Sequence, residues 1–327
     1  MINTPKHTIL ITGGAGFIGS NLCEYFLKKN HFVICLDNFA TGHKHNIDSF
    51  LDNKSFKLIN GDIRDFKTCQ NAIQNVDYVF HQAALGSVPR SINDPIMTNE
   101  VNVNGFLNMI TASRDANVKR FIYAASSSTY GDSETLPKTE SIIGKPLSPY
   151  AITKYVNELY ADVFSKTYGL ETIGLRYFNV FGQKQDPNGA YAAVIPKFVM
   201  QLMKHQSLIV NGDGTISRDF TYIDNVLEMN ELAMLTNNPR AINTVYNTAF
   251  GERNTINELV KCLKENLSVY DSNINNIPII YGNFRQGDIQ HSLANIDKAK
   301  ELLNYNPKFS MQQGLKQAID WYWNNLK

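Results

Sequence analysis

The stretch Thr12-Gly13-Gly14-Ala15-Gly16-Phe17-Ile18-Gly19 decides the fold of this chain. It follows an apolar run, Thr8–Thr12, and opens a segment with the apolar spacing of a helix, Phe17–Lys29. Glycine adopts backbone angles that other residues avoid and lets a phosphate approach the main chain. The N-terminus of a helix attracts anions. We therefore expect Gly13, Gly16 and Gly19 to form a dinucleotide-binding turn, although their spacing differs from the more familiar G-x-G-x-x-G.

The rest of the first half alternates short apolar runs with helical patterns. Strands are predicted at Thr8–Thr12, Phe32–Asp37, Phe56–Asn60, Tyr78–His81, Arg120–Ser126 and Thr172–Tyr177, and helices near Phe17–Lys29, Asp65–Asn75, Val101–Asn117 and Pro149–Tyr168. The strand patterns are too continuously apolar for a sheet with one wet face. This order predicts an α/β fold with a Rossmann-like, doubly wound parallel sheet.

The regular alternation of strand and helix patterns ends after about residue 178. Helices are predicted near Ala192–Lys204, Ile223–Leu235 and Ile256–Asn266, strands at Leu208–Asn211, Thr244–Asn247 and Ile277–Tyr281, and two helices at the end. We expect a Rossmann domain over residues 1–180, with part of 220–250 packing back onto it, and a smaller C-terminal α/β substrate lobe over 181–327. Ligands should bind in the cleft between them, beyond the carboxyl ends of the strands.

Composition excludes several classes of function. The 327 residues carry a net charge of +1 without a long basic run, which gives no indication of nucleic-acid binding. The four cysteines form no C-x-x-C pair, so we expect neither a metal site nor a disulfide framework. No apolar run is long enough to cross a membrane and no leader-like segment precedes the first strand, so we expect a cytoplasmic protein.

Acidic residues follow the second and third predicted strands. Asp37 ends the second strand, where a carboxylate can accept hydrogen bonds from the adenosine ribose and repel a 2′-phosphate. This position favours NAD over NADP. Asp62 and Ile63 follow the third strand and are expected to flank the adenine, although Gly61-Asp62 also has the composition of a simple turn.

Three side chains suggest proton transfer at an alcohol carbon. Tyr150 and Lys154 are four residues apart and share one face of a helix. A phenol has a pKa near 10, and we expect the ammonium, with a positive nicotinamide ring, to lower it until general-base catalysis is feasible. Ser126, at the carboxyl end of a strand, can hydrogen-bond a sugar oxygen and relay its proton.

The motifs TGGAGFIG, Asp37, GDIRD, SSSTYG, YAITK and LRYFNVFG, in this order, resemble the extended short-chain dehydrogenase/reductase family, most closely its nucleotide-sugar 4-epimerases. The resemblance covers nearly the whole chain. It implies tightly held NAD and a catalytic group of Ser126, Tyr150 and Lys154. It also implies cofactor contacts at Phe17, Ile18, Asn38, Gln82, Ala83, Ala84, Asn102, Tyr177 and Val180, besides the glycines, Asp37, Asp62, Ile63, Tyr150 and Lys154.

The serine turn narrows the expected reaction. Related dehydratases and decarboxylases carry acidic residues in this turn, whereas here Ser127 and Ser128 occupy those places, with no Asp or Glu between Ser126 and Tyr130. Epimerisation is then the simplest chemistry. NAD would oxidise C4 of the hexose to a 4-keto sugar, which turns over in the cleft and is reduced on its other face.

The resemblance also implies substrate contacts. Asn179, Arg218 and Arg285 are expected to contact the diphosphate. Asp288 and Asn211 are expected near the nucleoside, and Ala193 and Val194 near the uridine. The expected contacts to the sugar are Gly86, Ser87, Ser126 and Ser127. Epimerases restricted to UDP-glucose and UDP-galactose have a tyrosine four residues after the aspartate of R-x-G-D, where this chain has Ser292. The smaller side chain leaves room for an N-acetyl group and favours UDP-N-acetylglucosamine/UDP-N-acetylgalactosamine interconversion; the alternative is that Ser292 lies on a surface turn.

Alternatives stay open at this point. The substrate could be a UDP-N-acetylhexosaminuronic acid or UDP-glucose/UDP-galactose, and the reaction a net oxidation or reduction. A non-catalytic NAD-sensing protein is less favoured, because Ser126, Tyr150 and Lys154 are all retained.

The family often forms dimers through the helices near Val101–Asn117 and Pro149–Tyr168. We therefore expect a homodimer with apolar contacts at Val103, Leu107, Ile110, Val156, Leu159 and Val163, although burial within one chain explains these positions equally well. Polysaccharide synthesis is expected by analogy alone.

Overall fold

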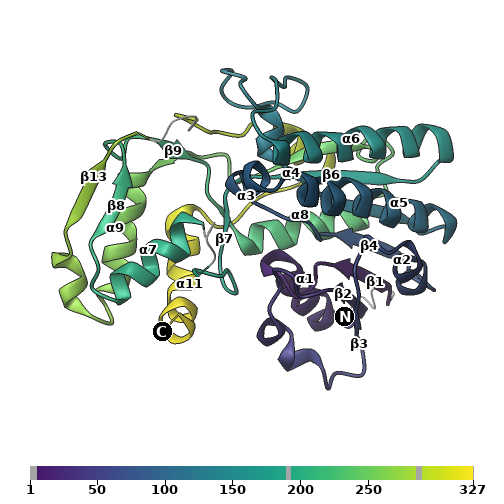
Figure 1. Ribbon diagram of the computed structural model, residues 1–327, viewed down its shortest axis with the longest axis horizontal. Helices are drawn as coiled ribbons and strands as arrows, with labels where there is room; N and C mark the ends of the chain where they lie inside the picture. The colour runs from purple at the N-terminus through teal and green to yellow at the C-terminus, as the bar shows by residue number, and fades with distance from the viewer. Residues whose placement is uncertain (1–5, 189–192, 285–288, 327) are drawn as a thin grey trace.

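A parallel sheet of seven strands forms the centre of the larger lobe (Figure 1). The computed structural model describes residues 6–188, 193–284 and 289–326. In spatial order the strands are β11 (Thr244–Thr248), β6 (Thr172–Tyr177), β5 (Arg120–Ser126), β4 (Tyr78–His81), β1 (Thr8–Thr12), β2 (Phe32–Asp37) and β3 (Phe56–Asn60). All neighbouring strands are parallel. The direction of winding reverses at β1, so the predicted doubly wound fold class is confirmed, as are the bounds of β1 to β6.

Helices cover both faces of this sheet because alternate strand residues point to opposite sides. Ile9 and Ile11 belong to a core shared with α1 (Phe17–Lys28) and α8 (Ile223–Leu235). Leu10 lies in a separate core on the other face. The helices of that second face are α2 (Phe66–Ala72), α5 (Gly105–Asp115) and α6 (Pro149–Tyr168). Burial on both faces explains the continuously apolar strand patterns.

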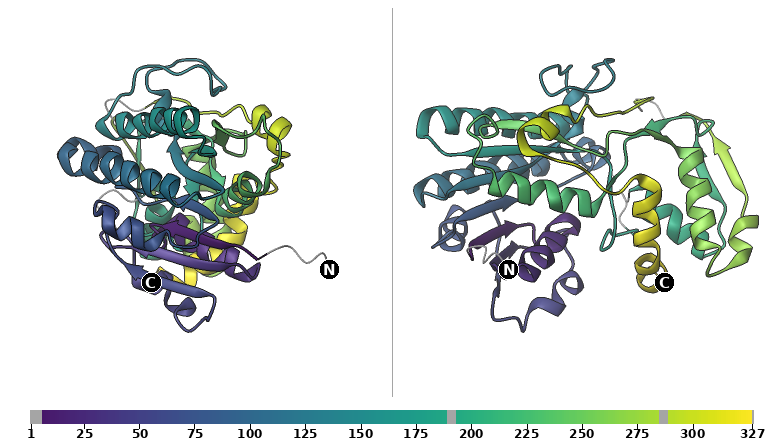
Figure 2. Two further views of the ribbon diagram at one scale, coloured as in Figure 1. Left: turned by 90° about the vertical axis from the view of Figure 1, so that its right-hand side faces the viewer. Right: turned by 180° about the vertical axis from the view of Figure 1, so that it is seen from behind.

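The smaller lobe follows along the chain and lies at the left of Figure 1. It contains α7 (Val194–Met203), α9 (Ile256–Leu267), α11 (Met311–Asn325) and the parallel pair β8 (Leu208–Asn211) and β13 (Ile279–Gly282). The view from behind in Figure 2 shows α11 on the side of this lobe nearer to the large sheet. From residues 220–250, β11 joins the large sheet beside β6, and α8 packs beneath it.

Short elements connect the two lobes and complete the chain. They are β7 (Val180–Phe181) paired with β10 (Thr221–Tyr222), β9 (Ser217–Arg218) paired with β12 (Asn254–Thr255), α10 (Asp297–Leu303), and the helical turns Lys44–Asn46, Asp48–Phe50, η4 (Ser127–Tyr130) and Ser272–Asn276. Among the described helices, none is long and apolar enough to cross a membrane.

Two short helices after β4 are absent from the sequence-based expectation. The first, α3 (Val88–Asn93), is capped by the Ser87 hydroxyl, and the second, α4 (Pro95–Asn99), by the Asp94 carboxylate. A π-helical turn, η3 (Glu100–Asn104), then leads into α5. The predicted helix Val101–Asn117 is therefore the end of a longer helical stretch.

Candidate active site

The Gly-rich turn connects β1 to α1 at the carboxyl edge of the sheet. Gly13 has a φ of +68°, and a Cβ there would lie 2.8 Å from the backbone of Ala83. A Cβ on Gly19 would lie 2.1 Å from the carbonyl oxygen of Gly13. The N-cap of α1, Gly16, contributes no side-chain hydrogen bond, so the first turn of the helix is left without a side-chain cap. This backbone cradle fits a phosphate group.

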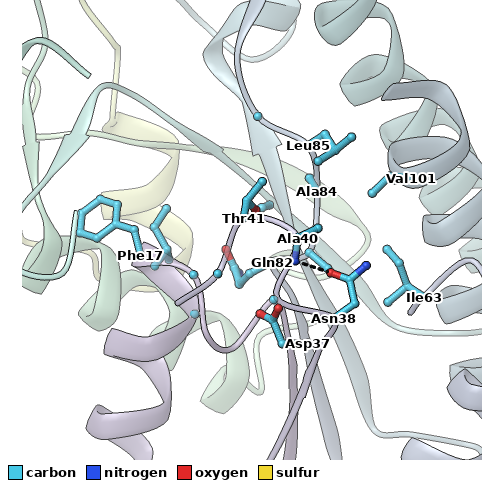
Figure 3. A pocket seen from close by; sticks show the side chains of 18 of the residues that line it. Phe17, Asp37, Asn38, Ala40, Thr41, Ile63, Gln82, Ala84, Leu85 and Val101 are labelled. Atoms are coloured by element: carbon cyan, nitrogen blue, oxygen red, sulfur yellow. Dashed lines mark hydrogen bonds between the residues drawn. The ribbon is translucent and has the colours of Figure 1, made fainter. Parts of the chain in front are cut away.

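Asp37 supports this turn through hydrogen bonds and lines the cleft that the three glycines also line (Figure 3). Its carboxylate accepts hydrogen bonds from the backbone N–H of Ala15 at 2.9 Å and of Phe39 at 2.7 Å. Asn38, the next residue, donates to Asp62 at 2.8 Å. A hydrogen-bonded Arg64 is the main reason that the pKa of Asp62 falls to about 2, so this carboxylate is charged at neutral pH. Two carboxylates thus lie along one end of the cleft.

The cleft has a volume of about 430 Å³ and brings together nearly all the predicted cofactor contacts. Its lining contains the predicted residues Gly13, Gly16, Phe17, Ile18, Gly19, Asp37, Asn38, Asp62, Ile63, Gln82, Ala83, Ala84, Tyr150, Lys154, Tyr177 and Val180. It also contains Leu36, Ala40, Thr41, Gly42, Gly61, Leu85, Val101, Ala124 and Ala125, which sequence reasoning missed. Several of the missed residues are small and lie in turns after strands, where no side-chain chemistry marks them.

Asn102 is the predicted cofactor contact that does not line this cleft. It is 1% exposed. Its amide accepts a hydrogen bond from Leu85 N at 2.7 Å and donates to Leu85 O and to the Thr153 hydroxyl, both at 3.1 Å. In this structure Asn102 fixes the segment after β4, which lines the cleft, and its own contact with the cofactor stays a prediction.

Tyr150 and Lys154 lie one turn apart near the start of α6. The hydroxyl of Ser148 caps this helix by accepting from Ala151 N at 3.1 Å. The Lys154 ammonium donates to the carbonyl oxygen of Ala124 at 2.8 Å and lies 5.9 Å from the centroid of the Tyr150 ring. Ser126, the last residue of β5, lies beside them, and its Oγ accepts from Ser128 N at 3.1 Å.

Burial controls the ionisation of this group. It lowers the pKa of Lys154 to about 8, and the carboxylate of Glu158 opposes the shift. Burial also raises the pKa of Tyr150, while a hydrogen bond with Ser126 lowers it. These side chains alone therefore leave the pKa of Tyr150 above its usual value, because desolvation of the phenolate is the larger effect, and the lowering expected from Lys154 together with a bound nicotinamide ring stays a prediction.

A second cleft, of about 450 Å³, opens beside the first. Ser126 and Asn179 line both clefts, so the two clefts meet at the predicted catalytic group. The second lining contains the predicted substrate contacts Ser126, Ser127, Asn179, Arg218 and Ser292, together with Val88, Pro89, Ile92, Asn93, Ser128, Tyr130, Lys138, Phe178 and Ile289. Residues from α3, the serine turn and the smaller lobe thus surround one space.

Comparison with known proteins places this geometry in a family. Residues 9–249 match the NAD dependent epimerase/dehydratase family. The chain belongs to this family. It is therefore an NAD-dependent enzyme of the epimerase type, and the resemblance recognised in its sequence is confirmed.

Three solved structures are similar to this epimerase over almost the whole chain. A UDP-N-acetylglucosamine 4-epimerase from Methanobrevibacter ruminantium is 35% identical, with a TM-score of 0.90 over 98% of this chain and 99% of its own. The UDP-glucose 4-epimerase of Thermotoga maritima is 34% identical, with a TM-score of 0.89 over 98% and 100%. The UDP-glucuronic acid 4-epimerase of Bacillus cereus is 30% identical, with a TM-score of 0.87 over 97% and 99%.

Other predicted substrate contacts of the epimerase lie elsewhere. Gly86 lines the cofactor cleft, and the Ser87 hydroxyl caps α3 by accepting from Arg90 N at 3.3 Å. Neither cleft lining includes Ala193, Val194 or Asn211, which belong to the smaller lobe. Arg285 and Asp288 lie outside the described residues. Their contacts with substrate remain predictions.

The arrangement suits proton transfer to a sugar hydroxyl next to a bound dinucleotide. Tyr150 and Lys154 line the cleft that carries the Gly-rich cradle, and Ser126 opens into both clefts. A hexose in the second cleft would place one ring carbon at the junction. The residues present therefore fit NAD and a nucleotide sugar together.

Proposed function

We propose that this epimerase catalyses the reversible 4-epimerisation of UDP-N-acetylglucosamine and UDP-N-acetylgalactosamine through a 4-keto intermediate. The observation that carries the proposal is the meeting of the two clefts at Ser126, next to Tyr150 and Lys154. The solved structures described above contain UDP-glucose, UDP-N-acetylmuramic acid or UDP-glucuronic acid. These ligands support a UDP-sugar substrate, and the choice of hexose is argued from this chain's own residues.

In the proposed mechanism Tyr150 takes the proton from the sugar 4-hydroxyl and Ser126 bridges the two oxygens. NAD, when bound, supplies the redox chemistry by accepting hydride from C4 and returning it. Lys154 holds its ammonium at the end of β5, where it favours the phenolate over the phenol and orients the cofactor ribose. When C4 is reduced, Tyr150 returns its proton to the new hydroxyl.

Arg218 and Asn179 are proposed to hold the diphosphate in the second cleft. Both line this cleft, and Asn179 donates to the carbonyl oxygen of Asp219 at 3.1 Å, which fixes its position between the two lobes. A guanidinium matches the geometry of phosphate oxygens. If most of the binding energy lies on the nucleotide diphosphate, this part of the substrate stays bound while the hexose ring rotates in the cleft.

Ser292 is proposed to make room for the N-acetyl group. It lines the second cleft, and its backbone N–H donates to the carbonyl oxygen of Ser217 at 3.1 Å, so its position is fixed beside β9. A tyrosine at this point would fill space that a serine leaves open. Replacement of Ser292 by Tyr should therefore reduce turnover of N-acetylated sugars more than that of UDP-glucose.

We also propose that the epimerase is a homodimer that uses the outer face of α6. Ile152, Leu159 and Val163 are each about half exposed, at 52%, 49% and 50%. By contrast, Ile110 is fully buried, so its expected place in the interface is wrong: it packs into the core of its own chain. The exposed apolar side chains on this helix support a partner surface.

The decisive experiment offers the purified protein UDP-N-acetylglucosamine, UDP-glucose and UDP-N-acetylglucosaminuronic acid separately and follows inversion at C4 by NMR. We expect an equilibrium mixture of the two C4 epimers with the N-acetylhexosamine, formed without added reductant. Inversion of UDP-glucose alone would overturn the choice of sugar. A product oxidised or reduced in stoichiometric amounts would overturn epimerisation itself.

A further inference from the structure

Lys138 is a buried cation in the second cleft that sequence reasoning did not find. The residue is 5% exposed, yet it lines the cleft together with Ser127, Ser128 and Ser292. Its backbone is fixed on both sides, because its N–H donates to Leu293 O at 2.7 Å and its carbonyl oxygen accepts from Asn295 N at 2.9 Å. The backbone therefore holds Lys138 at a fixed place in the wall of the cleft.

The ammonium of Lys138 has a carbonyl partner rather than an anionic one. It donates to the carbonyl oxygen of Ser133. Among the residues that the structure describes, no carboxylate forms an ion pair with it, and Glu134 acts on it only through its longer-range charge. Burial lowers the pKa of Lys138, which means that water no longer stabilises the charge fully. An anionic ligand group would restore that stabilisation.

The position of Lys138 relative to the sugar follows from the reaction. Hydride can return to the opposite face of C4 only if the ring turns over, and this rotation exchanges the C2 edge with the C6 edge. A side chain at the wall of the hexose site therefore faces the substituent at C6 in one of the two orientations. The neighbouring Ser127 and Ser128 add hydroxyl donors at the same wall.

We propose that Lys138 is a specificity-determining residue that recognises a carboxylate at C6, so that the epimerase accepts nucleotide-linked uronic acids beside neutral sugars. The inference rests on the proposed function, because it takes the second cleft as the hexose site. It differs from the role of Arg218, which lies on β9 and is assigned to the diphosphate. A neutral 6-hydroxymethyl group would leave the Lys138 ammonium bonded to the protein alone.

The test measures binding by calorimetry, with NAD present, for UDP, UDP-glucose and UDP-glucuronic acid. These two sugars differ only at C6. We expect the wild-type protein to bind the uronic acid about tenfold more tightly than the hexose, since hydrogen bonds to charged groups contribute this much or more. Lys138→Met should weaken binding of the uronic acid by about tenfold to a hundredfold and that of UDP-glucose by less than about threefold.

Two further variants separate recognition from structure. Lys138→Arg keeps the charge and should retain part of the preference, whereas Lys138→Gln keeps a donor for Ser133 O and should lose it. Equal weakening of all three ligands in Lys138→Met would overturn the proposal by assigning Lys138 to the diphosphate or to the fold. A wild-type protein without preference between the two sugars would overturn it as well. Inversion at C4, followed separately by NMR, reports on the proposed function, so a protein that binds with this preference but does not invert C4 refutes only that function.

Discussion

Arg176 and Glu158 form an ion pair of 2.7 Å close to the proposed catalytic group, with side chains only 3% and 6% exposed. The Arg176 guanidinium contacts the carboxylate through two nitrogens, at 2.9 and 2.7 Å, and also donates to Glu140 O at 3.1 Å. Glu158 stands one turn beyond Lys154 on α6 and raises the pKa of that lysine against burial. The pair thus links the sheet, through β6, to the helix that carries Tyr150.

Replacement of Glu158 by Gln should destabilise the fold strongly, because it leaves the Arg176 guanidinium buried without a counter-charge. We expect the free energy of unfolding in urea to fall by about 3–5 kcal/mol. Asp162→Asn breaks an exposed pair with Lys166 on the same helix and should cost less than about 1 kcal/mol. Equal losses in the two variants would contradict the role given to the buried pair.

Tyr150→Phe should lower turnover by about two to four orders of magnitude, the range for loss of a general base. NAD and UDP should bind as before, because the ring still fills its place in the cleft. Tyr155→Phe is the matched control, because Tyr155 lies on the same helix but lines neither the cofactor cleft nor the second cleft. Steady-state kinetics and calorimetry would check this pair, and near-normal turnover of Tyr150→Phe would refute the proposed mechanism.

Gly13→Ala should destroy the phosphate cradle, because it adds a Cβ at 2.8 Å from the Ala83 backbone to the strain of a φ of +68°. Gly169 has a similar φ of +72° but open space around the added Cβ, so Gly169→Ala isolates the strain. We expect Gly169→Ala to cost about 1–2 kcal/mol of stability without changing NAD affinity. Gly13→Ala should bind NAD at least about tenfold more weakly in a fluorescence titration. Unchanged NAD affinity in Gly13→Ala would show that this turn does not hold the cofactor.

The proposed dimer makes its own prediction. The native chain, of 36.9 kDa, should sediment with twice that mass. Leu159→Asp with Val163→Asp places two charges on the exposed face of α6 and should give monomers. Val269→Asp is the control, since Val269 is 82% exposed in the smaller lobe. A monomeric native protein, or a double variant that still sediments as a dimer, would contradict the interface.

Much of the fold could be predicted because its signals are local. Strands β1, β2, β4, β5 and β6 are largely buried on both faces, so each has a continuous apolar pattern with clear ends, whereas the edge strand β3 is only partly buried. The two helices after β4 were missed because α3 and α4 are too short for a periodic pattern, although Asp94-Pro95 is a helix-start signal. Local capping therefore carried information that periodicity did not.

The candidate site likewise combines residues that local motifs predict with features that depend on contacts between distant segments. Gly13, Asp37 and Tyr150 belong to local motifs, and the structure brings them to one cleft. Lys138 reaches the second cleft only because its backbone pairs with residues 293–295, a contact that no local pattern records. The burial of Ile110, the internal bonding of Asn102 and the raised pKa of Tyr150 also depend on packing between distant segments.

The buried ammonium of Lys154 should make stability depend on pH. Its pKa is about 8 in the folded protein and near 10.5 when unfolded, so the unfolded chain holds the proton more tightly. The resulting destabilisation is fully present below pH 8 and disappears as the pH rises toward 10.5. Lys154→Met removes this destabilisation. In protein freed of NAD, the variant should therefore have a free energy of unfolding that is about 3 kcal/mol higher at pH 7 than that of the wild type, apart from effects of the substitution that do not depend on pH. Urea unfolding at several pH values should show this difference shrink toward pH 10.5, whereas Lys166→Met, at a lysine 71% exposed, should show no such trend. A difference that stays constant over this range would mean that Lys154 keeps its ordinary pKa in the fold.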